Sequence, residues 1–289
     1  MCGESVLPKF LTERMFGNEQ ALKRTVISGR KIQCGFATSE PCTFYSTVWD
    51  FVRKEKIHDV EFRGGLILTP HPLFVGSALK RKGLLPGLAD GLSLSLFAEW
   101  ARTVNQATRR MESLAVLVNH YKRLQKRNVS FMSGFMSPVL NGIIPESPLT
   151  RMLYPDYVQR NTARMGITDF QFSHFSDAAE VMAYTADGHP KTDLMVLVMT
   201  LPDANGELSH GPCAAFNGEV LERVLANLDQ DVLLYLNATY PFSRGLADAP
   251  NTLHVDRLKP LADAGRLFVV LDDGPIPALP AGSFDKPMA

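Results

Sequence analysis

The chain has 289 residues, and its 45% hydrophobic content is enough to bury the core of one large α/β domain or two small ones. Thirty basic residues balance thirty acidic ones, which argues against nucleic acid or a membrane surface as a partner. The four cysteines (Cys2, Cys34, Cys42 and Cys213) form no C-x-x-C pair. The sequence shows neither an apolar run of membrane-spanning length nor a signal-peptide cleavage signature. Together these three observations predict a cytoplasmic protein.

The first quarter of the chain alternates between helical and extended patterns. Residues 12–27 carry apolar side chains among charges, which predicts an amphipathic helix. Residues 31–34 predict a short strand, and residues 42–54 predict a helix whose aromatic and aliphatic side chains face inward. Strand pieces are expected at residues 60–62 and 66–68, on either side of two glycines, so the region predicts strand–loop–helix units.

The loop GFATSEP at Gly35–Pro41 joins the first predicted strand to the helix that follows it. Small residues at a helix start let backbone N–H groups approach an anion or a thioester, although the pattern is neither a Walker loop nor G-x-G-x-x-G. A plain tight turn is the alternative interpretation. His71, between two prolines, is left unassigned because no acid lies beside it in the sequence.

The middle of the chain changes character. Residues 84–127 have apolar side chains at helical spacing and predict two long helices outside the sheet. The basic cluster at 122–127 suits the negative end of a helix at least as well as an anion site. Residues 129–132 then predict a strand, and the small-residue segment Ser133–Pro138 predicts a second loop at the same edge.

The last third predicts the centre of the fold. The unbroken apolar run Leu194–Met199 is typical of a strand buried on both faces, and a Pro-Asp-x-Asn-Gly turn closes it. The resulting fold class is α/β, an open and mostly parallel sheet with helices on both faces and a ligand crevice at the carboxyl ends of the strands. The other elements expected here are strands at 169–172, 231–236 and 267–271 and helices at 177–184 and 216–228.

Three loops resemble those of a known family in order and spacing. They are GFATSEP at Gly35–Pro41, LPDANGELSHG at Leu201–Gly211, and LNATYPFSRG at Leu236–Gly245 followed by HVDRLKPLAD at His254–Asp263. Together they resemble the N-terminal half of the acetyl-CoA hydrolase/CoA-transferase family of class I fold. The resemblance implies one CoA-transferase-like domain at residues 1–271 with a helical insertion at about 84–128, and residues 272–289 predict a linker-like tail.

Members of that family have two similar halves, and the glutamate that attacks the acyl-CoA lies in the second half. The resemblance therefore implies a heteromeric acyl-CoA transferase or hydrolase in which a homologous partner subunit supplies the nucleophile, as a heterodimer or a heterotetramer. Glu40 and Glu219 are interpreted as structural. The expected ligands are an acyl-CoA and a carboxylic acid, with no metal and no cofactor beyond the coenzyme A thioester.

The chemistry implied by the resemblance starts with attack of a carboxylate on the thioester, and each tetrahedral step needs oxyanion donors. Arg244 is the candidate clamp for a substrate carboxylate, although the family places its arginine directly after the proline whereas this chain has Pro241-Phe-Ser-Arg244. The predicted substrate-binding residues are Gly35, Thr38, Ser39, Gly134, Phe135, Asn205, Asn237 and Arg244.

Two other classes of function stay open at the level of sequence. One is a catalytically silent scaffold or regulatory subunit of a complex that processes CoA thioesters. The other is an unrelated binder of a small anion or nucleotide that uses the loop at residues 35–41.

Overall fold

The computed structural model describes residues 7–35, 39–67, 71–76, 107–136, 165, 167–170, 178–212, 216–245 and 251–276. A seven-stranded sheet forms its centre, and neighbouring strands of that sheet pair in parallel. The strand order is β4-β3-β2-β1-β5-β7-β9, so the chain builds outward from β1 in one direction and then from β5 in the other. The strands are β1 (Lys31–Cys34), β2 (Val60–Ile67), β3 (Val129–Met136), β4 (Thr168–Phe170), β5 (Leu194–Thr200), β7 (Asp231–Asn237) and β9 (Leu267–Asp272).

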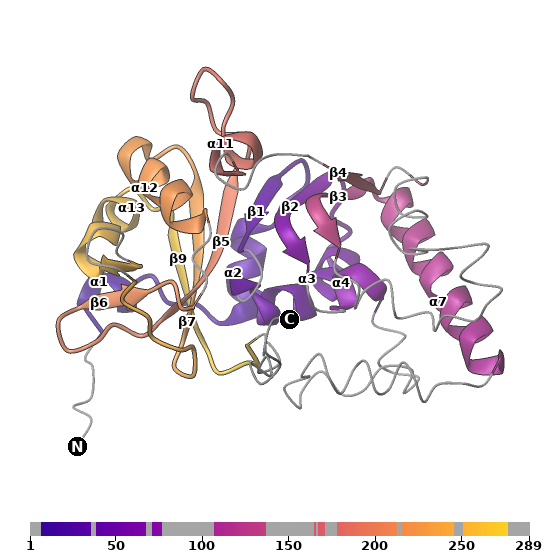
Figure 1. Ribbon diagram of the computed structural model, residues 1–289, viewed down its shortest axis with the longest axis horizontal. Coiled ribbons are helices and arrows are strands. Elements are labelled where there is room, and N and C mark those ends of the chain that lie inside the picture. Colours follow the sequence, from indigo (N-terminus) through magenta and orange to yellow (C-terminus); the bar gives the residue numbers. More distant parts are fainter. Residues whose placement is uncertain are drawn as a thin grey trace, which may run out of the picture.

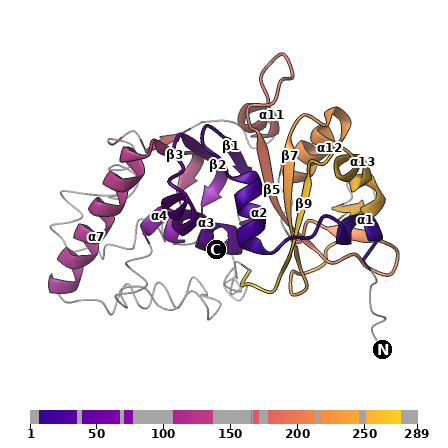
Figure 2. The same ribbon diagram turned by 180° about the vertical axis from the view of Figure 1, so that it is seen from behind.

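Helices cover both faces of this sheet. At one edge of the sheet, α7 lies beyond β3 and β4, and at the opposite edge α12 and α13 lie beside β7 and β9 (Figures 1 and 2). One buried cluster joins the sheet to α2 (Asn18–Thr25), α3 (Cys42–Lys54), α4 (Pro72–Val75) and α7 (Ala107–Lys126). A second cluster joins the other face to α1 (Lys9–Thr12), α11 (Ala178–Ala183), α12 (Asn217–Asn227) and α13 (Lys259–Asp263).

Strand β5 supplies both hydrophobic cores because successive side chains of a strand point to opposite faces. All seven of its residues are buried. Leu194, Val196 and Val198 lie in the first cluster, whereas Met195, Leu197 and Met199 lie in the second. Burying one such aliphatic side chain contributes about 1.5–3 kcal/mol, so a strand used on both faces organises the whole domain.

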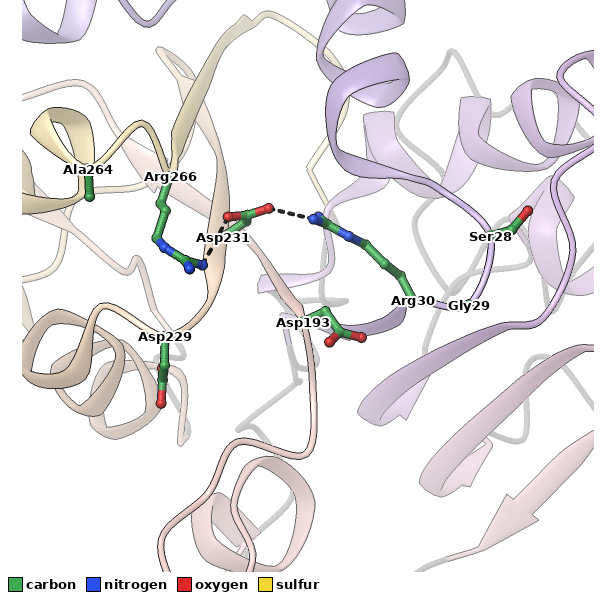
Figure 3. Close-up of a pocket in the computed structure, with 8 residues that line it drawn as sticks. All are labelled: Ser28, Gly29, Arg30, Asp193, Asp229, Asp231, Ala264 and Arg266. Carbon is green, nitrogen blue, oxygen red and sulfur yellow. Dashed lines mark hydrogen bonds and ion pairs between the residues drawn. The ribbon is translucent and has the colours of Figure 1, made fainter.

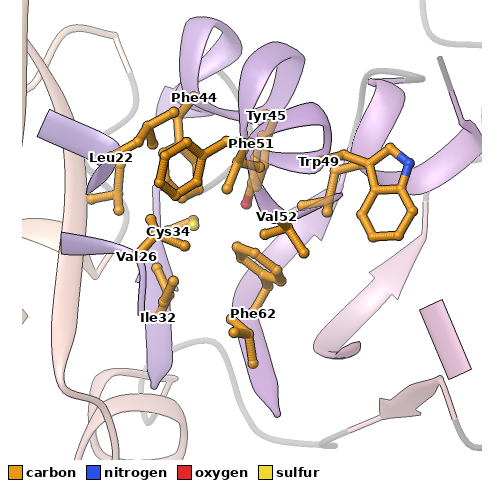
Figure 4. Packing of buried hydrophobic residues seen from close by; sticks show 14 of the residues in the cluster. Leu22, Val26, Ile32, Cys34, Phe44, Tyr45, Trp49, Phe51, Val52 and Phe62 are labelled. Atoms are coloured by element: carbon orange, nitrogen blue, oxygen red, sulfur yellow. The ribbon is translucent and has the colours of Figure 1, made fainter. Parts of the chain in front are cut away.

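The first face is rich in aromatic side chains. Figure 4 shows Phe44, Tyr45 and Trp49 of α3 packed over β1 and β2, with Cys34 and Phe62 beneath them. Phe44 and Phe62 meet edge-on with ring centroids 6.1 Å apart. Edge-to-face contacts of this kind add roughly 0.5–1.5 kcal/mol beyond the area they bury, so this one helps to hold α3 against β2.

The predicted fold class is confirmed, but several element boundaries were wrong. The single helix expected at 12–27 is two helices, since residues between them pair with β9: Phe16 N donates to Val269 O at 2.8 Å, and Val269 N donates to Arg14 O at 2.9 Å. The two strand pieces around residues 63–65 are one strand, because Gly64 keeps its ladder position opposite Ser133.

Strand β3 continues to Met136 instead of ending at Met132, so Gly134 and Phe135 are strand residues and not loop residues. Of the two helices expected at 84–127, α7 forms the second, and residues 84–106 lie outside the described residues. Asp272 is the last residue of β9 and Ile276 packs against the first cluster, while residues 277–289 of the expected tail lie outside the described residues.

Candidate active site at the carboxyl edge of the sheet

The direction of strand addition reverses between β1 and β5. Open α/β sheets bind ligands outside the carboxyl ends of the strands at such a switch point. Three of the loops singled out from the sequence start there, since they follow β1, β5 and β7, which are neighbours in the sheet. The structure therefore brings together the loops that begin at Gly35, Leu201 and Asn237.

After β1, Gly35 and Ser39 approach each other closely. The amide of Gly35 donates to Val196 O at 3.1 Å, and a Cβ at position 35 would lie 2.0 Å from Ser39 O, so only glycine fits. The Gly35 amide therefore already has a partner within the chain. Ser39 is buried, and its hydroxyl lies 3.1 Å from the Tyr240 hydroxyl. Thr38 lies outside the described residues.

Tyr240 joins the three loops. Besides its contact with Ser39, its hydroxyl donates to His210 O at 3.0 Å. Gly211, with φ +75°, lies so close to the ring that a Cβ there would be 2.4 Å from two ring carbons. Ser209 Oγ accepts from Gly211 N at 3.0 Å and completes the turn after β5. The loops after β1, β5 and β7 are thus held by one buried phenol.

Asn237, at the end of β7, is buried and bonded on both sides of its amide. Its Nδ2 donates to Asp272 Oδ2 at 3.2 Å and to Gly274 O at 3.0 Å, and its Oδ1 accepts from Thr239 N at 2.9 Å. The other oxygen of Asp272 accepts from the Thr43 hydroxyl at the start of α3, at 2.7 Å. These contacts tie β7, β9 and α3 together, so the structure gives the Asn237 side chain an organising position.

Arg244 points to the surface and is paired within the chain. Its guanidinium lies 3.0 Å from Asp203 Oδ2 and over the exposed Phe242 ring, and 67% of the side chain is exposed. Backbone N–H donation, from Glu207 first, lowers the pKa of Asp203, and Arg244 adds to that shift. Asn205 lies exposed in the same turn and donates its backbone N–H to Asp203 Oδ1 at 2.8 Å.

One buried pair at this edge was missed from the sequence. Glu40 follows β1 in the chain, and His71 follows β2, the neighbouring parallel strand. Glu40 Oε2 and His71 Nε2 are 3.3 Å apart, and each side chain is only 1% exposed. The missing signal was the pairing of β1 with β2, which brings their carboxyl ends together although the two residues are far apart in sequence.

The described cysteines at this edge do not offer a nucleophile. Cys34 and Cys42 are buried and unpaired in disulfides. Burial raises the pKa of Cys34 to about 12 and raises that of Cys42 well above its ordinary value. Thiols held in the protonated form are poor nucleophiles. In the same described part of the chain no group of His, Cys, Asp and Glu residues is placed to hold a metal ion.

The described part of the chain also contains a pocket of about 510 Å³ at the opposite, amino edge of the sheet. There Asp231, the first residue of β7, lies between two arginines, 2.7 Å from Arg30 and 3.4 Å from Arg266 (Figure 3). Asp193 accepts the Lys31 amide at 2.8 Å. These contacts join the starts of β1, β5, β7 and β9, so the pocket is a structural charge cluster remote from the motif loops. No described helix has the length and apolarity needed to cross a membrane.

No protein-family model matches the sequence, and no curated protein sequence matches it significantly. Among solved structures, RipA from Yersinia pestis has a TM-score of 0.54 at 14% identity, covering 95% of this chain and 46% of RipA. A 4-hydroxybutyrate CoA-transferase from Porphyromonas gingivalis (TM-score 0.41, 12% identity, 93% and 41% covered) and a malonate decarboxylase alpha subunit from Acinetobacter baumannii (0.44, 12%, 91% and 34%) overlap more loosely. The chain shares the fold of RipA and spans less than half the length of each of these proteins.

Proposed function

We propose that this chain is one subunit of an enzyme that acts on a CoA thioester, by transfer of CoA to a carboxylic acid or by hydrolysis. The observation that carries the proposal is the meeting of three motif loops at the switch point of the sheet. Those loops resemble the acetyl-CoA hydrolase/CoA-transferase family in order and spacing, and they lie where α/β sheets of this topology bind ligands. The shared fold with RipA supports the architecture on which the proposal rests.

The proposed reaction begins when a glutamate attacks the acyl carbonyl and forms a mixed anhydride. The released thiolate then attacks that anhydride to give a glutamyl-CoA thioester and the free acid. Neither glutamate considered from the sequence suits this role. Glu40 is buried against His71, and Glu219 lies on α12, bonded to Arg223 at 2.8 Å. We therefore place the nucleophile in a homologous second half, carried by a partner subunit.

In this proposal the chain contributes positioning groups rather than the nucleophile. Backbone N–H groups of the loop after Gly35 bind the oxyanion, and Arg244 and Asn205 bind the carboxylate or the CoA phosphates. Gly134 and Phe135 take part through their position at the end of β3. Asn237 acts by holding β7 to β9.

One observation favours the alternative of a catalytically silent scaffold. The polar side chains at the carboxyl edge are engaged with one another, as the Asn237 amide and the Arg244–Asp203 pair show. A regulatory subunit retains such a network for stability without turning over substrate.

The experiment that separates the two is co-expression with homologous candidate partners, followed by an acyl-CoA assay and mass detection of a glutamyl-CoA adduct on either chain. The enzyme reading predicts turnover by the complex and an adduct on the partner. A stable complex with neither turnover nor adduct supports the scaffold. Turnover by the purified chain alone at ordinary enzyme rates, ~1 s⁻¹ or more, contradicts the partner-supplied nucleophile.

A further inference from the structure

Glu40 and His71 form a buried acid–imidazole pair beside the candidate site. Glu40 Oε2 lies 3.3 Å from His71 Nε2, and the side chains are each 1% exposed. The pair joins the loop after β1 to the turn after β2, at the same edge as the motif loops. An acid and a histidine in this arrangement are the base and orienting group found where a nucleophile is activated.

Two aromatic rings lie near His71 in the described part of the chain. The Tyr45 ring lies 5.3 Å from the His71 ring, and the Phe74 ring lies 6.3 Å from it. Burial raises the pKa values of Cys34, Cys42 and Tyr45, and the charge of Glu40 adds to each shift. These two thiols and the Tyr45 phenol therefore keep their protons at neutral pH. A low-dielectric environment of this kind strengthens the Glu40–His71 hydrogen bond.

The contact with Glu40 decides which ring nitrogen of His71 is the base. When Nε2 carries the hydrogen and donates it to the Glu40 carboxylate, Nδ1 carries the lone pair. Nδ1 is buried and has no hydrogen-bond partner within the described structure. A buried polar atom without a partner is costly, and in proteins such atoms commonly bind an enclosed water or belong to a catalytic group.

We propose that His71, oriented by Glu40, is the general base that activates water, and that the complex is consequently a CoA-thioester hydrolase. This inference rests on the proposed function and chooses between its two reactions. CoA transfer exchanges carboxylates and thiolate without consuming water, so it does not need a base that activates water. Hydrolysis consumes water and does need such a base.

The proposed step balances as follows. A water hydrogen passes to His71 Nδ1 while the water oxygen bonds to the acyl carbon of the thioester or of the glutamyl intermediate. Collapse of the tetrahedral intermediate breaks the bond to the leaving group, a thiolate or the partner's carboxylate. The imidazolium then returns its proton to that leaving group or to solvent.

His120 provides a matched control. It is also a buried histidine, 3% exposed, but its Nε2 lies 2.8 Å from Leu73 O and no carboxylate partner is present among the described residues. Burial lowers its pKa to about 4, so it is neutral and donates to that carbonyl. Replacing each histidine by glutamine removes one buried imidazole and keeps a polar side chain.

The first test is independent of any CoA chemistry. Imidazole ¹⁵N shifts of His71 between pH 6 and 8 are expected to report hydrogen on Nε2 and a lone pair on Nδ1, and Glu40→Gln is expected to change them. A proton fixed on Nδ1, or shifts that ignore Glu40→Gln, overturn the inference.

The second test measures both reactions of the co-expressed complex, with acetyl-CoA and butyryl-CoA as probes and propionate as acceptor. His71→Gln is expected to lower hydrolysis ~100-fold or more while CoA transfer to propionate persists, since glutamine cannot accept a proton. His120→Gln is expected to leave the ratio of the two reactions unchanged. A merely structural His71 would lower both reactions together, which overturns the inference. A wild-type complex that transfers CoA without hydrolysing it also overturns the inference but keeps the proposed function, whereas the absence of both reactions removes the proposed function itself.

Discussion

Gly211 is expected to be one of the least replaceable residues of the candidate site. Alanine there adds two costs. The backbone has φ +75°, a conformation that costs an L-residue about 1–2 kcal/mol. The new Cβ would also lie 2.4 Å from the Tyr240 ring, and forcing an extra methyl into a packed site costs about 1–3 kcal/mol. Tyr240 cannot move away cheaply, because its hydroxyl bonds His210 O.

Gly265 separates the two costs. Its φ is +73°, but nothing lies within 4 Å of a Cβ built there. Urea unfolding should therefore show Gly265→Ala destabilised by about 1–2 kcal/mol and Gly211→Ala by about 2–5 kcal/mol. In a Tyr240→Ala background the cost of Gly211→Ala should fall to the Gly265→Ala level. Equal losses in the two single variants would refute the steric argument.

Three further predictions concern charge. Asp231→Asn weakens the ion pairs of Asp231 with Arg30 and Arg266 at the amino edge of the sheet, and it should lower the free energy of unfolding measured in urea by about 1–3 kcal/mol. Burial lowers the pKa values of His120 and His210 to about 4. The stability that each neutral histidine contributes above pH 6.5 should therefore be lost as the pH falls toward 4, by up to about 3 kcal/mol for each. His120→Gln should remove the contribution of His120 to this pH dependence. Arg244→Ala should change the free energy of unfolding by only about 0–1 kcal/mol, because the ion pair with Asp203 is exposed. If Arg244 binds substrate, the same substitution should also lower kcat/KM of the complex by a factor that corresponds to about 1.5–3 kcal/mol of lost transition-state binding.

Local patterns predicted the elements that carry strong periodicity. Leu194–Met199 is continuous and apolar, and it forms the strand that both cores share. The helix at 42–54 was predicted with its bounds, because its apolar spacing needs no information from elsewhere. The failure at residues 12–27 has a tertiary cause. Residues 14–16 form backbone hydrogen bonds with the outer edge of β9. These bonds to a distant strand outweigh the weak helical preference of residues 14–16.

The site was predictable only to the level of its loops. The order and spacing of their motifs in the sequence identified three loops, and the parallel sheet brings these loops to one edge. Which side chains face a ligand depends on contacts between loops, and the sequence contains no local sign of these. Asn237 illustrates this, because its amide is bonded to Asp272, Gly274 and Thr239. Gly35 does too, since its amide is bonded to Val196.

The switch point explains why Ser39 and Glu40 make contacts in opposite directions. Strand β1 has β2 on one side and β5, followed by β7, on the other. Ser39 bonds Tyr240 from the β7 side, and the next residue, Glu40, pairs with His71 from the β2 side. Two adjacent residues therefore connect the two halves of the sheet at its carboxyl edge, and one peptide unit joins the hydroxyl contact of Ser39 to the acid–imidazole pair of Glu40 and His71.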